Sequence, residues 1–558
     1  MDYELPTNFD LIVVGTGVVE SMVSAAASRI GKTVLQIDSK DYYGGDWASF
    51  NLETIQKLIS MESNEAQIDV NGVSIEDDEV VVGVGNDIFN LKDVEQTWNI
   101  IEKFPEKNVE EDLNVVEEVK EVGDNKNDDV INEGWSQEKL LKENRKFNID
   151  ISPKVQFARG DFVELLISSN IARYSEYRSV SRVLTYLNNQ LEIVPCSRSD
   201  VFSNTKVSVI EKRMLMKLLT ACLDGDENEF RGYENKTFFT YLKDKKLTEN
   251  VIHYVLYAIA MCTIETLCPV AVQSVKRFVT SLGRFGKTPF LYSMYGSGEL
   301  SQAFCRLSAV FGGVYALNQK LNGFIFDKGN DFKGIICGKQ RINGSNLVMG
   351  VDKAPKSFVG DVSEKRISRG IFVIDRSIMS SEKEHLTLLL FPNQDGKRNC
   401  NVIEMGSLTG TCPKDILLLH MFIEQNASPK EDLNFVVEKL FKPKDDDSNE
   451  CPPNILWSFY YSTSNTNDSD LTKNLGKNVF LCPGPDMDLD IDGSIKKAKK
   501  IFNALYTDCE FLPRAPDPEE LIIGEEEEDE KQDKEGNEKD EINNDNVKNV
   551  DEVNNETT

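Results

Sequence analysis

The sequence predicts an α/β protein in which a large sheet domain is interrupted by a smaller all-helical domain. Three observations lead to this class. The chain opens with a strand–turn–helix–strand pattern over residues 10–38, residues 205–285 show the apolar spacing of helices, and short apolar strands return after Pro289. A chain of 558 residues also exceeds the size that one hydrophobic core ordinarily serves, so more than one domain is expected.

The N-terminal unit is the clearest part of this pattern. Residues 10–14 form a nearly continuous apolar run, which is typical of a strand buried in a parallel sheet. A glycine turn follows at 15–17, the alanine-rich residues 21–30 predict a helix, and residues 33–38 predict a second strand that ends in an acid. This order is the Rossmann-type unit that binds dinucleotides in many proteins.

The glycine turn departs from the dinucleotide-binding fingerprint at one position. Gly15 and Gly17 supply the first two small residues, but Glu20 stands where the third is required. A carboxylate there adds bulk where the helix must pack closely. It also brings negative charge to the helix N-terminus, where a phosphate would otherwise bind. Asp38, 23 residues after Gly15, matches the position of a ribose-binding acid.

Two interpretations of this unit remain open. One is an FAD or NAD oxidoreductase that tolerates the substitution, and the other is a vestigial fold whose cofactor site is non-functional. Glu20 favours the second, and no cluster of candidate catalytic residues supports the first. We therefore predict a non-functional FAD site and no bound cofactor.

The apolar periodicity predicts the remaining elements in order. The predicted helices cover 162–172, 205–223, 251–261, 274–282, 301–311, 431–440 and 493–505. The predicted strands cover 324–326, 334–337, 370–374, 386–391, 416–422 and 479–482. These elements divide the chain into a first sheet-domain part at 1–61, an acidic mobile insert at 62–138 with short strands around 79–84, a sheet-domain segment with a flanking helix at 139–204, the helical domain at 205–285, the rest of the sheet domain at 286–518, and a disordered acidic tail at 519–558.

The net charge of −30 belongs almost wholly to two segments. Residues 62–138 contain 23 acidic and 5 basic residues, and residues 525–558 contain 15 and 4. The other 447 residues are close to neutral, with 55 acidic and 54 basic residues. Because no part of the chain carries a large basic surplus, nucleic acid is not expected as a partner.

Composition also limits metal binding and location. The 3 histidines are scattered, so a histidine-based metal site is not expected. The 11 cysteines form no CxxC pair, the opening residues lack an apolar signal core, and no apolar run is long enough to span a membrane. We therefore expect a reduced, cytoplasmic protein.

Several longer segments resemble one protein family. The matching segments are 15–21, 41–45, 286–292, 295–307 and 311–317. They resemble the Rab GDP-dissociation inhibitor and Rab escort protein superfamily. Three further segments resemble its escort branch, of the fungal type, also called component A of Rab geranylgeranyl transferase: 211–217, 258–261 and 304–306. The likeness covers roughly residues 8–60 and 151–515.

The resemblance implies a fold like that of FAD-linked oxidoreductases of the amine-oxidase kind, without bound flavin. It also implies a non-catalytic accessory subunit rather than an enzyme. Both implications agree with the interpretation of Glu20, which rests on the residues alone.

The resemblance further implies that the sheet domain carries a platform for a GTPase. The matching residues, called here the predicted platform, are Tyr43, Glu299, Gln302 and Arg306. Glu299 and Arg306 are seven residues apart, about two helical turns, so they can lie on one face and offer charge-assisted hydrogen bonds. Spacing alone favours the alternative that Glu299 caps the helix and Arg306 is an ordinary solvated side chain, and the resemblance reverses that preference.

The resemblance gives the helical domain two further roles. For docking of the prenyltransferase, the matching residues are Phe278 and Arg284, an aromatic anchor and a nearby base. For shelter of a geranylgeranyl chain, apolar residues of the required kind are Val209, Leu215, Leu219, Val255 and Ile259. Phe278 and the apolar residues could instead belong to the hydrophobic core.

The mechanism implied by the resemblance is presentation. The protein would bind a Rab/Ypt-type GTPase in its GDP state and present it to the α/β heterodimer of Rab geranylgeranyl transferase. It would then shield the geranylgeranyl group and deliver the GTPase during transient contact with a membrane. The alternatives are a Rab GDP-dissociation inhibitor that only recycles prenylated Rab, and a flavin-dependent oxidoreductase.

Overall fold

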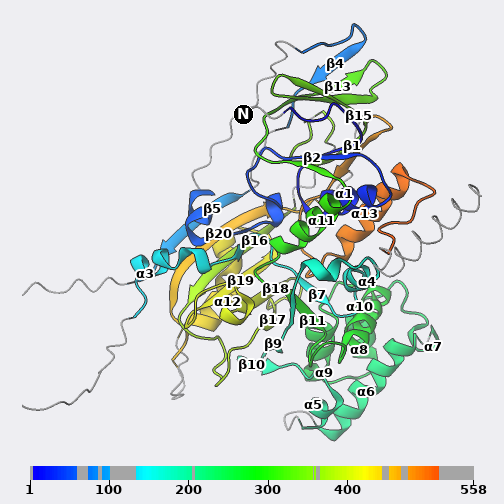
Figure 1. Cartoon of the computed structure of the whole chain (residues 1–558). Helices are drawn as coiled ribbons and strands as arrows, with labels where there is room; N and C mark the ends of the chain where they lie inside the picture. Colours follow the sequence, from blue (N-terminus) through cyan, green and yellow to red (C-terminus); the bar gives the residue numbers. More distant parts are fainter. Residues whose placement is uncertain are drawn as a thin grey trace, which may run out of the picture.

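The structure is a computed structural model. It describes residues 4–58, 73–85, 91–100, 134–203, 208–225, 227–355, 357–359, 365–442, 451–466 and 475–514. Figure 1 shows a first sheet region at the top, a second sheet at the left and centre, and a group of helices at the lower right. The predicted acidic tail and much of the predicted insert lie outside the described residues.

The first sheet contains the N-terminal unit. Strand β1 (Asn8–Val14) pairs in parallel with β2 (Val34–Ile37), and helix α1 (Val18–Arg29) connects them, which confirms the Rossmann-type prediction. The other strands are β4 (Glu79–Val82), β12 (Val314–Ala316), β13 (Leu321–Asp327), β14 (Phe332–Cys337), β15 (Gln340–Gly350) and β21 (Val479–Cys482). Their order is β12-β2-β1-β15-β14-β13-β4, and β21 pairs with β15.

Helix α1 packs on this sheet between α11 (Gly298–Val310) and α13 (Asp492–Leu505). Alanines and serines on α1 let the neighbouring helices approach closely. Ser24 and Ser308 form a side-chain hydrogen bond of 3.1 Å between α1 and α11. The small residues predicted to form a helix therefore also fix the position of α11, which carries most of the predicted platform.

The second sheet is larger and mostly antiparallel. Its strands are β5 (Lys92–Trp98), β9 (Arg182–Leu187), β10 (Gln190–Ile193), β16 (Arg366–Ile374), β17 (Thr387–Pro392), β18 (Asn399–Met405), β19 (Leu417–Glu424) and β20 (Ile455–Ser464). Their order is β10-β9-β17-β18-β19-β16-β20-β5. Helix α12 (Pro429–Phe441) covers one face and packs on β16, β19 and β20.

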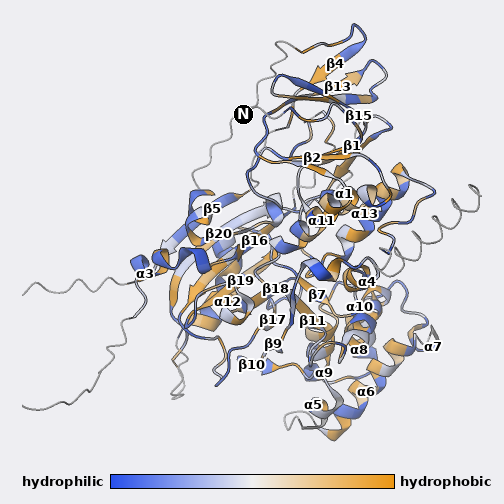
Figure 2. Cartoon of the chain, in the orientation of Figure 1, coloured by the Kyte–Doolittle hydropathy of each residue, from blue (hydrophilic) through white to orange (hydrophobic). Residues whose placement is uncertain are grey.

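The predicted insert contributes an edge strand to each of these two sheets. Strand β4 falls within the predicted strand region at 79–84 and pairs with β13. Strand β5 was not predicted, and its pairing with β20 corrects the description of this part of the insert as mobile. Its side chains are mostly polar and exposed because it lies at a sheet edge, so its sequence lacks a strand-like apolar pattern (Figure 2).

Shorter elements join the sheets to the helices. Two small sheets pair β3 (Ser49–Phe50) with β6 (Ile149–Asp150), and order β7 (Val155–Phe157), β11 (Phe290–Ser293) and β8 (Tyr177–Ser179). The helices outside the helical domain include α2 (Leu52–Lys57), α3 (Gln137–Lys142), α4 (Asp161–Ser168) and α5 (Arg198–Ser203).

The segment predicted as the helical domain contains helices and no strand among its described residues. These helices are α6 (Val209–Asp224), α7 (Glu227–Phe230), α8 (Phe238–Asp244), α9 (Glu249–His253), a π-helical segment (Tyr254–Ile259) and α10 (Cys268–Ser281). Helix α6 begins with a capping box between Ser208 and Glu211. No helix of the described chain is long and apolar enough to cross a membrane.

Candidate functional site

The start of α11 is anchored by the buried carboxylate of Asp150. The backbone N–H of Ser297 donates to Asp150 at 2.8 Å, and the hydroxyls of Ser49 and Tyr292 donate at 2.6 and 2.7 Å. The backbone N–H of Gly298 donates in turn to the Ser49 hydroxyl at 2.9 Å. Burial raises the pKa of Asp150, and these hydrogen bonds oppose that shift. The carboxylate thus binds the first turn of α11 to β3 and β6.

A glycine is required just before this turn. Gly296 has a φ of +103°, and a Cβ at this position would lie 2.5 Å from the Ser49 hydroxyl and 2.6 Å from an Asp150 oxygen. Both the backbone conformation and the close approach exclude a larger residue. The Tyr-Gly-Ser-Gly sequence at 295–298 therefore determines where α11 begins.

Three of the predicted platform residues form a stripe along α11. Glu299 and Gln302 are half-buried and Arg306 is exposed, whereas Leu300 and Phe304 between them are buried. Burial raises the pKa of Glu299, and the charge of Arg306 opposes that shift. Among the described residues, the side chains of these three residues have no hydrogen-bond or ion-pair partner, so their polar groups remain available to another molecule.

The fourth platform residue, Tyr43, lies in the loop after β2, and its ring packs edge-on against Tyr315 with ring centroids 6.1 Å apart. The N–H of Gly44 donates to the Thr16 hydroxyl at 3.0 Å, and that hydroxyl donates to Asp38 at 2.7 Å. A Cβ at Gly44 would lie 3.0 Å from the Ser301 hydroxyl, so the loop lies directly against α11. The structure therefore brings three of the predicted residues to one helix and the Tyr43 loop against that helix, and their binding role stays a prediction.

The side chain of Glu20 lies over the glycine turn. Its Oε2 atom is 2.5 Å from where a Cβ at Gly17 would lie, and its Oε1 atom is 2.7 Å from the equivalent position at Gly350. Glu20 is 5% exposed, and Oε2 has no hydrogen-bond partner among the described residues. A carboxyl group therefore occupies the space in which a pyrophosphate would approach the turn, and these residues do not fit a dinucleotide.

Other carboxyl groups lie near Glu20, and an anionic pyrophosphate would be unfavourable beside them. Burial raises the pKa of Glu20 to about 8, and the nearby carboxylates of Asp352 and Asp38 add to the shift. Burial also raises the pKa of Asp46 to about 7. Asp38, which matched the ribose-binding acid, lies 3.6 Å from the ammonium of Lys353 and accepts the Thr16 hydroxyl. Its carboxylate is thus already bound within the protein.

The structure corrects the predicted role of the Phe278 ring. Phe278 is 1% exposed and packs edge-on against Phe290, with ring centroids 5.9 Å apart. Phe278 follows the buried Val275 by three residues on α10, a spacing that puts both side chains on the inner face. The ring is therefore not available to a docking partner in this structure, and the exposed aromatic residue nearby is Phe285.

Arg284 is also engaged within the protein. Its guanidinium donates to the backbone carbonyl of Ala158 at 2.9 Å and pairs with Glu164 of α4. The same guanidinium lies 5.1 Å from the Phe285 ring centroid. Docking of a prenyltransferase at Arg284 stays a prediction.

The five apolar residues predicted to line a lipid groove do not form one open surface. Val255 and Ile259 are buried in the π-helical segment, Leu215 is buried in α6, and Leu219 packs against the same core. This corrects the prediction for Leu215, Val255 and Ile259, because their side chains are buried in the core. Val209, by contrast, is 65% exposed.

The helical domain has other exposed apolar side chains that the sequence prediction missed. Ile210 lies beside Val209 at the start of α6, and Leu267 and Val270 lie at the start of α10, which packs against α6. In the sequence these residues are apolar positions within the predicted helical domain. Such positions look the same whether the side chain faces the solvent or the core, so the sequence did not identify them as exposed.

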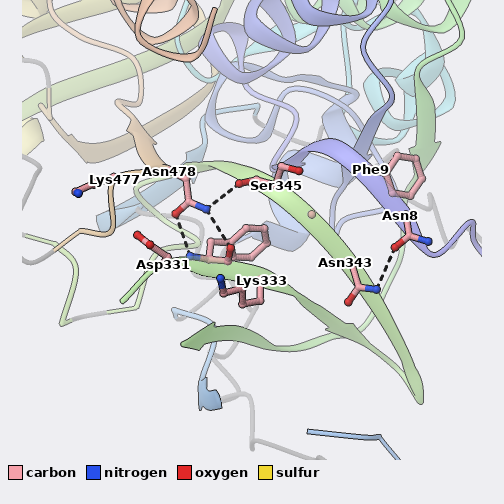
Figure 3. A pocket seen from close by; sticks show the side chains of 10 residues that line it. Asn8, Phe9, Asp331, Lys333, Asn343, Ser345, Lys477 and Asn478 are labelled. Atoms are coloured by element: carbon pink, nitrogen blue, oxygen red, sulfur yellow. Dashed lines mark hydrogen bonds between the residues drawn. The ribbon is translucent and has the colours of Figure 1, made fainter. Parts of the chain in front are cut away.

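A groove of about 500 Å³ lies elsewhere, beside β1, β14 and β15 (Figure 3). Asn478 spans it and donates to the backbone carbonyls of Phe332 and Ser345 at 3.0 and 2.7 Å. Asn343 donates to Asn8 at 3.1 Å. The amide groups thus connect neighbouring strands, and no predicted site residue lines this groove.

Comparison with known proteins identifies the family to which the chain is similar. Residues 1–74 and 129–446 match the sequence model of the family described as GDP dissociation inhibitor. The fold is similar to the crystal structure of the Rab GDI from Plasmodium falciparum, with a TM-score of 0.61 and 17% identity over 90% of this chain and 99% of that one. It is also similar to an oxidoreductase from Methanosarcina mazei, with a TM-score of 0.51 and 11% identity over 88% and 99%.

The branch of the family follows from a relative that matches over nearly the whole of both chains. Rab proteins geranylgeranyltransferase component A 2 from Mus musculus is 32% identical over 94% of this chain and 99% of its own. The chain therefore belongs to the GDP dissociation inhibitor family, in its Rab geranylgeranyltransferase component A branch. The resemblance inferred from the sequence and the predicted fold class are both confirmed.

Proposed function

We propose that this protein is an escort for Rab-type GTPases. It binds a Rab in the GDP state, presents the Rab's C-terminal cysteines to the α/β heterodimer of Rab geranylgeranyl transferase, shields the added lipid and delivers the Rab to a membrane. The observation that carries the proposal is the similarity to component A over nearly the whole of both chains. Cytoplasmic location with transient membrane contact follows from this cycle.

Shielding the lipid explains why such a protein is needed. Each buried CH₂ group of a prenyl chain contributes about 0.8 kcal/mol, so a free geranylgeranyl group drives aggregation or uncontrolled membrane insertion. A higher affinity for GDP-bound than for GTP-bound Rab gives the cycle its direction, because nucleotide exchange at the membrane then releases the Rab.

The predicted platform is the proposed GTPase-binding surface. Glu299, Gln302 and Arg306 lie on one stripe with no partner among the described residues, and the Tyr43 loop lies against the same helix. A protein partner can complete the hydrogen bonding of these groups, and Arg306 is the most exposed of them.

The protein acts in this proposal as an accessory subunit without its own catalysis. The Glu20 carboxyl over the glycine turn supports the absence of a functional flavin site. We expect the purified protein to show no flavin absorbance band. A stoichiometric band would contradict both the cofactor proposal and the accessory role.

The direct test is prenylation in vitro. The full chain, a GDP-loaded Rab, the catalytic heterodimer and geranylgeranyl diphosphate are combined, and lipid transfer to the Rab is measured with and without the chain. We expect transfer that depends on the chain. No transfer above background would contradict the escort proposal.

The second candidate is a GDP-dissociation inhibitor that only extracts prenylated Rab. The match to the GDP dissociation inhibitor family and to the Plasmodium Rab GDI fold is the observation that favours it. Extraction of prenylated Rab from membranes without support of prenylation would establish this alternative.

A further inference from the structure

Helix α13 presents a basic face to the solvent. Three of its lysines are exposed and one is half-exposed: Lys496, Lys499, Lys500 and Lys497. The opposite face, which includes Ile495 and Phe502, is buried against α1 and the first sheet. The single acid of the helix, Asp492, is buried and pairs with Arg277 rather than with these lysines. All charged residues on the outer face of α13 are therefore lysines.

The basic face continues onto the C-terminal ends of α1 and α11. The ammonium of Lys32 lies 5.7 Å from the ring centroid of Tyr506, which follows α13. The guanidinium of Arg29 lies 4.5 Å from the ring centroid of Phe311, which follows α11. We call the resulting surface the basic edge, and it consists of Arg29, Lys32, Lys496, Lys497, Lys499 and Lys500.

Among the described residues, the lysines of α13 make a single ion pair, and it is a long one. Lys496 makes a long contact of 3.9 Å with Asp161, and Lys497, Lys499 and Lys500 make none. Asp161 pairs with Lys496 and Asp10 interacts with Lys32, whereas the basic edge itself contains six bases. A basic surface in a chain with a net charge of −30 is complementary to an anionic partner.

Two apolar side chains border the basic edge. Val310, at the end of α11, is 63% exposed, and Phe311 is 37% exposed beside Arg29. Lysines flanked by exposed apolar and aromatic side chains are typical of surfaces that meet the headgroup region of a bilayer. The apolar face of α13 itself is buried, so the helix cannot insert and any binding must be superficial and reversible.

We propose that the basic edge docks the protein on an anionic lipid bilayer. The inference deepens the proposed function, because it identifies the surface at which an escort meets the membrane. Lysine ammonium groups are compact, hydrated charges that suit a mobile layer of headgroups rather than a fixed bidentate acceptor. Each such lysine near an anionic membrane adds a small favourable contribution, so four give useful but reversible affinity.

The test is co-sedimentation of the full chain with vesicles. Vesicles of phosphatidylcholine alone are compared with vesicles that also contain phosphatidylserine. We expect binding to the anionic vesicles only, weakened by added salt and reduced at least ~10-fold in the Lys499→Glu/Lys500→Glu variant. The matched control is Lys414→Glu/Lys439→Glu, which changes the charge equally at two exposed lysines beside the second sheet.

Three results would overturn the inference. One is equal loss of binding in the control variant, and another is equal binding of the wild type to neutral vesicles. The third is binding only after removal of residues 525–558, which would make that acidic segment the occupant of the basic edge in the full chain. Prenylation in vitro is expected to be unchanged in both variants, because that assay needs no membrane. A wild-type chain that does not support prenylation would therefore contradict the proposed function and not the membrane-docking inference.

Discussion

At the scale of single residues, Glu20 places a buried carboxyl group over the glycine turn at the start of α1. The side chain occupies the space over the glycine turn, and burial raises its pKa to about 8. A carboxyl group with this pKa is mainly neutral near pH 7, which reduces the cost of keeping it in the core. Because the carboxyl keeps its proton only in the folded state, its burial costs stability as the pH rises above its ordinary pKa.

We expect Glu20→Gln to stabilise the protein at alkaline pH. The folded-state pKa of about 8 exceeds the ordinary value of 4.5, so the folded state holds this proton more tightly and wild-type stability falls as the pH rises between these values. Glutamine has no proton to lose, so the variant avoids this fall. Chemical unfolding should show little difference near pH 4.5 and a gain of about 5 kcal/mol above pH 8.

The exposed Glu382→Gln variant is the control for this experiment, because that side chain is solvated. If the difference between Glu20→Gln and wild type did not change with pH, the buried carboxyl would not be protonated in the folded state.

Substitution of Arg306 is expected to affect Rab binding but not stability. Its side chain is exposed and has no ion-pair partner in the described chain, so Arg306→Ala should leave the melting temperature almost unchanged. Loss of a charged contact in the predicted platform should weaken binding of GDP-bound Rab about 10-fold, or roughly 1.4 kcal/mol. Titration calorimetry measures the affinity of the wild type and of the Arg306→Ala variant for GDP-bound Rab. The exposed Arg231→Ala variant is the control, and an equal effect in the two variants would remove Arg306 from the platform.

At the scale of elements, α11 connects the core to the predicted platform. Its start is bound to Asp150 and Ser49, and its serine-lined face packs on α1. The stripe of Glu299, Gln302 and Arg306 therefore lies on a helix that cannot rotate without breaking buried hydrogen bonds. Rigid support of this kind keeps binding groups in position before the partner arrives.

Gly296→Ala is expected to disturb both stability and Rab binding. The added methyl group would meet the Ser49 hydroxyl at 2.5 Å, and the φ of +103° is unfavourable for alanine. Displacement of the first turn of α11 should cost about 3 kcal/mol of unfolding free energy. The control is Gly312→Ala, with a φ of +85° and no atom within 4 Å, which should lose only about 1 kcal/mol. Equal losses would show that the contacts at Gly296 contribute nothing.

At the scale of the whole molecule, buried charges join the helical domain to the sheet domain. Arg277 of α10 pairs with Asp490 at 2.8 Å and with Asp492, and its guanidinium lies 4.1 Å from the Phe157 ring centroid. Both carboxylates are buried just before or at the start of α13. Arg277 therefore contributes charged contacts to the junction of the two domains, beside the Phe278–Phe290 and Arg284–Glu164 contacts.

Arg277→Ala should destabilise the protein by about 3 kcal/mol, because two buried carboxylates lose their partner. The control is Lys276→Ala, the neighbouring half-buried base, which should stay close to wild type. Thermal unfolding measures the difference. A loss no larger in Arg277→Ala than in the control would mean that the junction is held by apolar contacts instead.

Much of the fold was predictable because it depends on local pattern. The apolar runs at 10–14 and 33–38 and the glycine turn between them specified β1, α1 and β2, since neighbouring residues alone determine that unit. Strand β5 could not be predicted, because its polar residues become a strand only through pairing with β20 across a gap of more than 350 residues in sequence.

The sequence by itself determined the class of the protein. Glu20 in the third position of the turn and the blocks around 286–317 indicated a vestigial dinucleotide fold with an escort-like platform, and those features are local in the chain. Only the tertiary structure decided which apolar side chains are available. Phe278, Val255 and Ile259 have the chemistry of a binding surface but lie in the core, since burial depends on contacts between distant elements. The basic edge likewise exists only because folding turns the lysines of α13 outward beside Arg29 and Lys32.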